Sequence, residues 1–456
     1  MVSRTAERPA DQPRANVMGS TGRMGGIPLF VAIFIIGLFI PLFIFLGPLR
    51  LSVYRVVLFL LFFPALFRLL NGLAGRMRLP DFCVIGICVW SSISLTVIHG
   101  IGPMVESIGI LWIETLGAYL VGRVYIRTPD AFHATIRLLF WLGMLMLPFA
   151  IVEAVTSRNL VLELFGKIGP TLSHVSADMG GRLGLNRVQG PFDHPILFGV
   201  VIGSLVGLSY YVLGYGRSAI KRILRALMAA LTAGLSLSSG PMIAIMTQIY
   251  LIIWDGIFQS YIKRWYAIIV LAILGFIVID ILSNRTPFHV IATYIAFSPQ
   301  TAYGRILIWT HGVQNILSNP LFGLGLNDWQ RPAWMTSSID MFWIVGAIRH
   351  GIVVWVLWIL LFFSIFLKVA FSKGLNTRLQ DYRTGYLITL FGLFLAGWTV
   401  HFWNASFVFF MFLLGSGLWM TESASDEVVD VEPQEGSRAV GYSRFPPRST
   451  GRAEAR

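Results

Sequence analysis

The sequence contains few charged residues. Asp, Glu, Lys and Arg make up 12% of its 456 residues, against about 25% in ordinary soluble domains. Hydrophobic residues make up 56%, and the mean hydropathy is +0.73. This composition argues against a soluble globular protein, and it makes the distribution of the apolar residues the first question.

Sequence signals for disulfides, metals and nucleotides are also missing. The two cysteines, Cys83 and Cys88, lie in one apolar run, which fits neither a disulfide framework nor a metal site. The chain has no internal repeat, Walker A loop, glycine-rich dinucleotide fingerprint or metalloprotease helix. We therefore expect neither ATP hydrolysis nor a nicotinamide cofactor, and we predict that the protein uses no cofactor and no metal.

The sequence is instead rich in long apolar runs without charge. About 20 helical residues, at roughly 1.5 Å each, cross the roughly 30 Å hydrocarbon core of a membrane. The runs predict an all-α polytopic membrane protein with about 12 transmembrane helices. Their approximate ranges are 27–47, 53–70, 82–98, 104–122, 135–154, 195–214, 223–238, 241–257, 265–282, 344–369, 384–401 and 403–419.

Basic residues indicate the side of the membrane. Many of the Arg and Lys residues behind the net charge of +13 lie in short connections, where they act as topology signals, so we expect no nucleic-acid partner. With the N-terminus inside, the short outside turns near 48–52, 99–103, 239–240 and 402 contain only Arg50. The inside segments contain Arg4, Arg8, Arg14, Arg23, Arg76, Arg78, Arg123, Arg127, Arg217, Lys221, Arg222, Lys263, Arg264, Lys373, Arg378 and Arg383.

This alternation predicts three parts. Residues 1–24 form a cytoplasmic tail before an uncleaved first helix, residues 25–420 form the transmembrane domain, and residues 421–456 form a disordered cytoplasmic tail. Two outside segments, about 155–194 and 283–343, are longer than ordinary connections. Their aromatic and turn residues predict folded periplasmic structure.

The second long loop contains the sharpest local pattern. Apolar residues at helical spacing predict a short helix over 303–317, lying along the membrane surface. It includes Gly304-Arg305-Ile306-Leu307-Ile308-Trp309 and is followed by Asn319-Pro320-Leu321-Phe322-Gly323-Leu324-Gly325. The arginine offers a planar fork for phosphate oxygens, and the glycines permit left-handed backbone and close approach of a ligand. The alternative interpretation is an interfacial Arg–Trp anchor beside a tight turn.

Two further features accompany this loop. One is Leu235-Ser236-Leu237-Ser238-Ser239-Gly240-Pro241 at a junction between runs, and the other is Arg182, Arg187 and Gly190-Pro191-Phe192-Asp193-His194-Pro195 just before a run. Together with the R-x-x-x-W … N-P-L-F-G-x-G loop, their order and spacing resemble the O-antigen ligase and polymerase superfamily. The resemblance covers about residues 50–420, and the chain looks most like an exopolysaccharide repeat-unit polymerase.

The resemblance implies a glycosyltransferase that works without metal at the periplasmic face of the bacterial inner membrane. The implied donor is an oligosaccharide repeat unit on undecaprenyl pyrophosphate. An acceptor hydroxyl attacks the anomeric carbon, lipid pyrophosphate leaves, and the configuration inverts. The implied partners are this lipid-linked oligosaccharide, membrane lipid, and polysaccharide export and chain-length proteins.

This chemistry suggests roles for particular residues. A pyrophosphate leaving group needs fixed cations, for which Arg305 with Arg187 or Arg182 are the candidates. The acceptor hydroxyl needs a positioned base. Ligases of this family place a histidine after the Gly-x-Gly turn, whereas this chain has Asp340 at that position. We therefore predict Asp340 as the base, and the departure favours a polymerase over a ligase.

Other ionisable residues have two interpretations each. His194 is expected either to orient the donor or to cap the following helix. Arg349, beside His350, is expected either to bind substrate or to join a structural ion pair. Arg55 is expected to pair with Glu106 at a similar depth, and the alternative is that Arg55 binds donor phosphate.

Two other functions compete with polymerisation. A ligase would share the transfer chemistry but move finished glycan onto a lipid core or a protein. A non-enzymatic polysaccharide or lipid transporter would typically show broken spans at matching places in two halves. The chain has one clear break, near Ser239–Pro241, and its two long outside loops suit an extracytoplasmic reaction better.

Overall fold

The protein is mainly helical. The computed structural model describes residues 23–422, except 25, 48, 172–180, 285–289 and 291–298. Within these residues, two short hairpins are the only sheets. Eight helices are long and apolar enough to cross a membrane, and each overlaps one of the predicted runs. The helical, multi-pass character predicted from the sequence is therefore confirmed.

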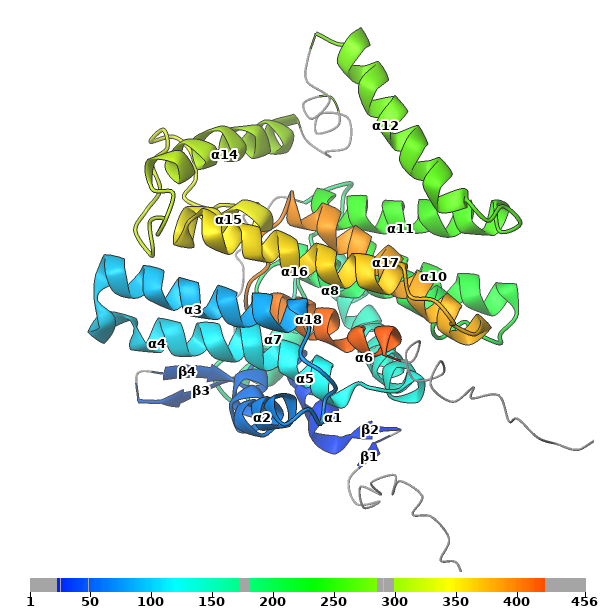
Figure 1. Ribbon diagram of the computed structural model, residues 1–456, viewed down its shortest axis with the longest axis horizontal. Coiled ribbons are helices and arrows are strands. Elements are labelled where there is room, and N and C mark those ends of the chain that lie inside the picture. Colours follow the sequence, from blue (N-terminus) through cyan, green and yellow to red (C-terminus); the bar gives the residue numbers. More distant parts are fainter. Residues whose placement is uncertain are drawn as a thin grey trace, which may run out of the picture.

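The elements follow one another along the chain as Figure 1 shows. The N-terminal part contains β1 (Arg23–Met24), β2 (Ile27–Pro28), α1 (Leu29–Gly37), β3 (Phe43–Leu46), β4 (Leu49–Ser52) and α2 (Val53–Leu70). Next come α3 (Leu79–His99), α4 (Ile101–Trp112), the π-helical turn η1 (Ile113–Gly117), α5 (Ala118–Tyr125), α6 (Pro129–Thr156), α7 (Leu160–Gly166), α8 (Pro195–Gly203) and α9 (Leu205–Tyr211). The remainder contains α10 (Ala219–Gly234), α11 (Ser239–Ile257), α12 (Arg264–Leu282), α14 (Pro299–Ser318), α15 (Phe342–His350), α16 (Ile352–Ala370), α17 (Thr377–Gly397), α18 (Asn404–Ser416) and the 3₁₀ turn η3 (Leu418–Thr421).

The first predicted run, 27–47, does not form one helix. α1 ends at Gly37, and the residues from Phe43 pair as an antiparallel hairpin with Phe43 opposite Ser52. Pro41 lies between the two and lacks the backbone N–H that a continuing helix would use. The prediction of a single helix is therefore wrong in the second half of this run.

The run 344–369 also divides, into α15 and α16. Gly351 separates them with φ +86°, and a Cβ there would collide with the carbonyl of Leu321. Ile352 donates its backbone N–H to the Pro320 carbonyl at 2.8 Å, so the break is tied to the Pro-containing turn. Arg349 consequently lies at the end of a short helix and not inside a continuous span.

The predicted break between α10 and α11 is confirmed. α10 ends at Gly234, α11 begins at Ser239, and Leu237 between them has φ +44°. Gly240 lets the first turn of α11 approach the segment before α18 closely, because a Cβ at Gly240 would lie 2.5 Å from the Val400 side chain.

The helix ends predicted to be inside lie side by side. Arg378 at the start of α17 pairs with Asp130 of α6 at 2.6 Å, and Arg222 of α10 pairs with Asp381 of α17 at 3.1 Å. Such pairs require these ends to face the same side, as the alternation of basic connections predicts. Which side of a membrane they face stays a prediction.

A second cluster at this end surrounds Glu422. Its carboxylate lies 3.1 Å from Arg123, 2.9 Å from Arg127 and 3.8 Å from Arg78. The Arg123 side chain is fully buried and also lies 3.4 Å from Asp81. Of the two predicted tails, residues 1–22 and residues 423–456 lie outside the described part of the chain.

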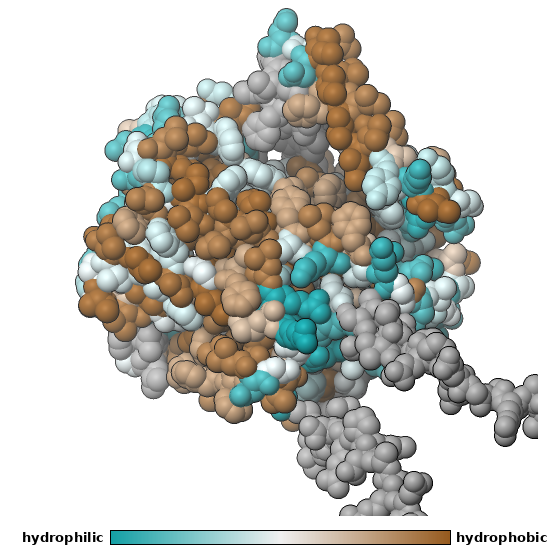
Figure 2. All heavy atoms as spheres, in the orientation of Figure 1, coloured by the Kyte–Doolittle hydropathy of each residue, from teal (hydrophilic) through white to brown (hydrophobic). Residues whose placement is uncertain are grey.

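α12 stands apart from the other helices in Figure 1. None of its residues is buried, and it is among the most apolar helices of the chain. Figure 2 shows it as a brown, hydrophobic column, while hydrophilic side chains gather toward the lower centre and right of that face. An apolar helix with no buried residue fits a lipid environment.

Both long loops contain folded structure in their described parts, as predicted. The first contains α7, and its Pro170 carbonyl accepts a hydrogen bond from the backbone of Phe43 at 3.0 Å. The second contains α14, which includes the predicted helix over 303–317. A small separate core fastens this loop to α15; it consists of Ile308, Trp329, Met335, Ile339, Met341, Ile344 and Ile348.

Candidate functional site

Several segments predicted to be outside meet at one place, which we call the loop junction. It consists of residues 187–194, 235–241, 339–342 and 398–404, together with Arg182 and Arg305, whose side chains donate hydrogen bonds to Leu237 and Thr399. Val188 donates its N–H to the Leu235 carbonyl at 3.1 Å, and Phe342 donates its N–H to the Val400 carbonyl at 3.0 Å. In Figure 1, α3, α4 and α15 extend on the left beyond the ends of α11 and α17 that enter the junction. In this view the junction therefore lies farther from that tip of the molecule than the ends of α3, α4 and α15 do.

Arg305 and Asp340 lie together in the junction. Arg305 Nη1 is 3.7 Å from Asp340 Oδ2, and Arg305 Nε donates to the Thr399 carbonyl at 2.8 Å. Asp340 also accepts a hydrogen bond from the Ser338 hydroxyl. Burial lowers the pKa of Arg305, an effect that Asp340 opposes. The two residues predicted to be catalytic are thus neighbours.

His194 caps α8, which confirms the more conservative of its two interpretations. Its Nδ1 accepts the backbone N–H of Ile196 at 3.1 Å, which leaves the proton of the neutral ring on Nε2. Burial, followed by the charge of Arg187, lowers the pKa of His194 to about 4, although Asp340 acts in the opposite direction. The charges of Arg187 and Asp340 both act on His194. The neutral ring can donate a hydrogen bond from Nε2 at neutral pH.

Arg182 and Arg187 hold the segment between α10 and α11. Arg182 donates to the Leu237 carbonyl at 2.8 Å, and Arg187 donates to the Ser238 hydroxyl at 2.9 Å. Burial and the neighbouring Arg182 lower the pKa of Arg187 to about 10, so Arg187 remains a cation at pH 7. The structure therefore brings these two arginines together with the motif that begins at Leu235.

Two aromatic side chains of the junction, His401 and Trp403, are absent from the sequence prediction. The Trp403 ring lies 6.1 Å from His194 and 5.9 Å from His401, measured between ring centroids. His401 Nδ1 is buried and has no hydrogen-bond partner among the described residues.

Arg349 and the glycine turn make their contacts with other residues of the protein. Arg349 donates to the carbonyls of Gly325 and Asn327, each at 3.0 Å. Gly323 and Gly325 have φ +67° and +60°, so the predicted left-handed backbone is confirmed. The close neighbour of this backbone is α15, because a Cβ at Gly323 would lie 2.6 Å from the Ile348 carbonyl oxygen. The contacts favour the tight-turn interpretation of this motif.

Arg55 pairs with Glu114 and not with Glu106. Arg55 Nε lies 2.8 Å from Glu114 Oε1, whereas Glu106 is exposed. Glu114 lies in η1, where the π-helical turn changes the face that each residue presents, and Tyr54 also donates to it at 3.3 Å. The prediction of an Arg55–Glu106 pair is therefore corrected.

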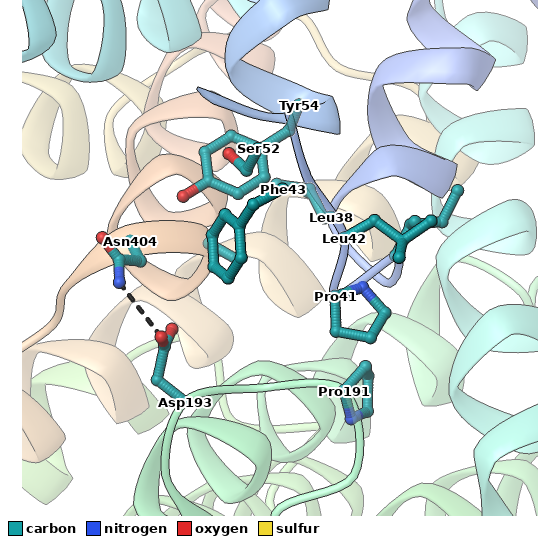
Figure 3. A pocket seen from close by; sticks show the side chains of 11 residues that line it. Leu38, Pro41, Leu42, Phe43, Ser52, Tyr54, Pro191, Asp193 and Asn404 are labelled. Carbon is teal, nitrogen blue, oxygen red and sulfur yellow. Dashed lines mark hydrogen bonds between the residues drawn. The ribbon is translucent and has the colours of Figure 1, made fainter. Parts of the chain in front are cut away.

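A small hollow adjoins this pair (Figure 3). Its polar lining residues are Ser52, Tyr54, Asp193 and Asn404, and the last two are joined by a hydrogen bond of 3.1 Å. The hollow has room for about one water molecule, which is too little for a sugar. Burial raises the pKa of Asp193, an effect that the hydrogen bond from Asn404 opposes.

The junction brings together cationic groups and a carboxylate. Three guanidinium groups, those of Arg182, Arg187 and Arg305, lie there, and guanidinium groups can stabilise negative charge that develops on an oxygen. The Asp340 carboxylate provides a proton acceptor. Within the described residues, no three His, Cys, Asp or Glu side chains gather in a way that could hold a metal ion.

No protein-family model matches the chain, and no curated protein is similar enough to count as a match.

Proposed function

We propose that the chain is a membrane glycosyltransferase. It polymerises oligosaccharide repeat units carried on undecaprenyl pyrophosphate, at the periplasmic face of a bacterial inner membrane. The observation that carries the proposal is the Arg305–Asp340 pair in the loop junction, to which Arg187 and His194 belong through their contacts with Ser238 and Trp403. A multi-pass helical protein that collects charged groups in one junction fits a reaction on a lipid-linked substrate.

The reaction needs one proton acceptor and fixed positive charge. The acceptor hydroxyl loses its proton to the Asp340 carboxylate as its oxygen bonds to the anomeric carbon. The bond from that carbon to the pyrophosphate oxygen breaks, and the electron pair leaves with the lipid pyrophosphate. Arg305 and Arg187 stabilise the negative charge that develops on the leaving oxygen. Attack opposite the leaving group inverts the configuration.

The environment of Arg305 suits this role. Its side chain is 14% exposed, and two of its nitrogen atoms are held by Thr399 and Asp340. A guanidinium fixed in this way is preorganised, so it needs little rearrangement when charge develops. Lysine cannot reproduce the planar fork that makes these two contacts.

The decisive experiment uses purified protein in lipid vesicles with a synthetic undecaprenyl-pyrophosphate-linked repeat unit. Wild-type protein is expected to lengthen the glycan without added nucleotide. The Arg305→Ala and Arg305→Lys variants are expected to lose activity by about a hundredfold or more, while they remain inserted and folded. Arg331→Ala provides the control, because Arg331 lies in the same loop and pairs with Asp328 outside the junction.

The outcomes separate the competing functions. Full activity of stably inserted Arg305→Ala would overturn the proposal. A cell that lacks the protein and accumulates single lipid-linked repeat units indicates a polymerase, and one that accumulates long lipid-linked chains indicates a ligase. Movement of the lipid-linked unit across the vesicle membrane, with no new glycosidic bond, would indicate a transporter.

A further inference from the structure

Asn404 joins three segments that are far apart in the sequence. Its Oδ1 accepts a hydrogen bond from Arg55 Nη2 at 3.1 Å, and its Nδ2 donates to Asp193 Oδ1 at 3.1 Å. Arg55 belongs to α2, Asp193 lies just before α8, and Asn404 begins α18. Figure 3 shows Asn404 and Asp193 facing each other across the edge of the hollow. One amide thus fastens two segments of the junction to α2.

The chemistry of these partners allows only one orientation of the amide. A guanidinium can only donate, so it must face the amide oxygen, and an ionised carboxylate can only accept, so it must face the amide nitrogen. Arg55 is itself held by Glu114 at 2.8 Å and by the Arg50 carbonyl at 3.1 Å. The orientation of the Asn404 amide is therefore set by Arg55, which is itself held in place by these two contacts.

The backbone at Asn404 also suits this residue type. Its φ is +49°, in the left-handed region that Asn and Gly adopt more readily than other residues. The ring of the preceding residue, Trp403, is close to those of both His194 and His401. The hydrogen bond to Asp193 links the residue after Trp403 with the residue before His194, so it controls the separation of the two segments.

We propose that Asn404 is a positioning residue for the transfer reaction proposed above. It holds residues 191–194 against residues 401–404, and it thereby sets where His194 lies relative to the Arg305–Asp340 pair. Arg55 acts through Asn404 and has no contact with the donor. The inference rests on the proposed function for its effect on rate, while its structural part is independent of that function.

The test exchanges the amide and the carboxylate between positions 404 and 193. Asn404→Gly removes the amide but keeps the left-handed backbone accessible, and we expect transfer to fall about a hundredfold, the effect of a shift of about 1 Å in a catalytic group. Asn404→Asp places two carboxylates opposite each other and is expected to be equally slow. The double variant Asn404→Asp with Asp193→Asn restores both hydrogen bonds, because the new carboxylate accepts from Arg55 and from the new amide. We expect it to recover transfer to within about tenfold of wild type.

Asn376→Gly is the matched control. Asn376 caps α17 at the other end of the bundle by accepting the Leu379 N–H at 2.9 Å. The same substitution there removes one side-chain hydrogen bond and leaves the junction intact, so transfer should be unchanged. If Asn404→Gly is as active as Asn376→Gly, or if the double variant is no faster than Asn404→Asp, the positioning role is wrong.

A second measurement does not depend on activity. Hydrogen–deuterium exchange of the purified protein should become faster over residues 187–198 in Asn404→Gly, and it should return to the wild-type rate in the double variant. Unchanged exchange in Asn404→Gly would overturn the inference even if the protein is a glycosyltransferase. If wild-type protein shows no transfer but hydrogen–deuterium exchange responds as expected, the proposed function is wrong. The structural role of Asn404 in holding residues 191–194 against residues 401–404 is then still supported.

Discussion

Asp340 and Asp328 offer a comparison between two carboxylates of the same loop. Asp340 lies 3.7 Å from Arg305, and its side chain is 27% exposed. Asp328 pairs with Arg331 at 2.7 Å, and its side chain is 66% exposed. Both pairs join Asp to Arg, but only Asp340 belongs to the loop junction. A comparison of variants at Asp340 and Asp328 therefore distinguishes a role in the proposed reaction from a role in an ordinary surface ion pair.

We expect Asp340→Asn to reduce transfer by a factor of about 10² to 10⁴, because an amide cannot accept the proton of the acceptor hydroxyl. Asp328→Asn is expected to leave the rate unchanged. The measurement is the initial rate of chain growth in vesicles that contain equal amounts of each inserted variant. Equal rates for the two variants would remove Asp340 from the mechanism.

His194 gives a prediction for pH. Burial and the charge of Arg187 lower its pKa to about 4, whereas an unfolded chain takes up this proton near pH 6.5. The contribution of His194 to stability is therefore complete above pH 6.5 and is lost as the pH falls toward 4. Histidine-selective NMR of wild type and His194→Gln should place its titration near pH 4, and a midpoint near 6.5 would contradict the buried position.

The site residues differ in how visible they are in the sequence. Arg305 and His194 stand beside Gly and Pro turns that mark the end of a run, so pattern alone draws attention to them. His401 and Asn404 lie within a stretch of aromatic and apolar residues, where hydropathy predicts only span. The partner of Asn404, Asp193, is 211 positions away, and a contact over that distance has no local signal.

At the scale of the helices, glycines define where long apolar runs stop being one helix. Gly351 combines φ +86° with a backbone neighbour so close that no Cβ fits. Gly374, between α16 and α17, has φ +73° with nothing within 4 Å of a Cβ. The two positions share the unusual backbone and differ in the space around it.

We expect Gly351→Ala to destabilise the protein by more than Gly374→Ala. The backbone strain alone costs about 1–3 kcal/mol at each position, and the collision with the Leu321 carbonyl adds to it at Gly351 only. Thermal unfolding of the purified variants in detergent measures the difference. Similar midpoints for both would mean that the α15–α16 turn relaxes without loss.

The helices themselves were largely predictable, and their interruptions were not. Hydrophobic length indicates α2, α3, α6 and α12 within a few residues of their bounds. The strand β3 is as apolar as the run in which it lies, so only its pairing with β4 shows that it is not helical. Glu114, the partner of Arg55, lies in the π-helical turn η1, and regular helical spacing does not predict such a turn.

For the whole molecule, the ion pairs at one end support the predicted alternation of the chain. Arg378 with Asp130 and Arg264 with Asp255 each join helices whose basic ends are expected inside. Segments of the loop junction lie at ends expected outside. This arrangement therefore predicts on which side of the membrane two particular connections lie.

A reporter fused after Asp328 should be outside the membrane, and one fused after Gly374 should be inside. Alkaline phosphatase is expected to be active at the first position and inactive at the second, and a fluorescent protein that matures only in the cytoplasm should give the reverse. The positive-inside rule provides the physical reason, because Lys373 and Arg378 flank the second position. The opposite pattern would put Arg305 on the wrong side for the proposed reaction.

α18 has a consequence for how the protein can be shortened. It begins at Asn404 and leads through η3 to Glu422, whose carboxylate neutralises the buried Arg123. A stop codon after Glu422 keeps every described contact, whereas one after Met420 removes one of the two carboxylates that pair with the buried Arg123 and leaves Asp81 as the other, so we expect it to lower the stability of the fold.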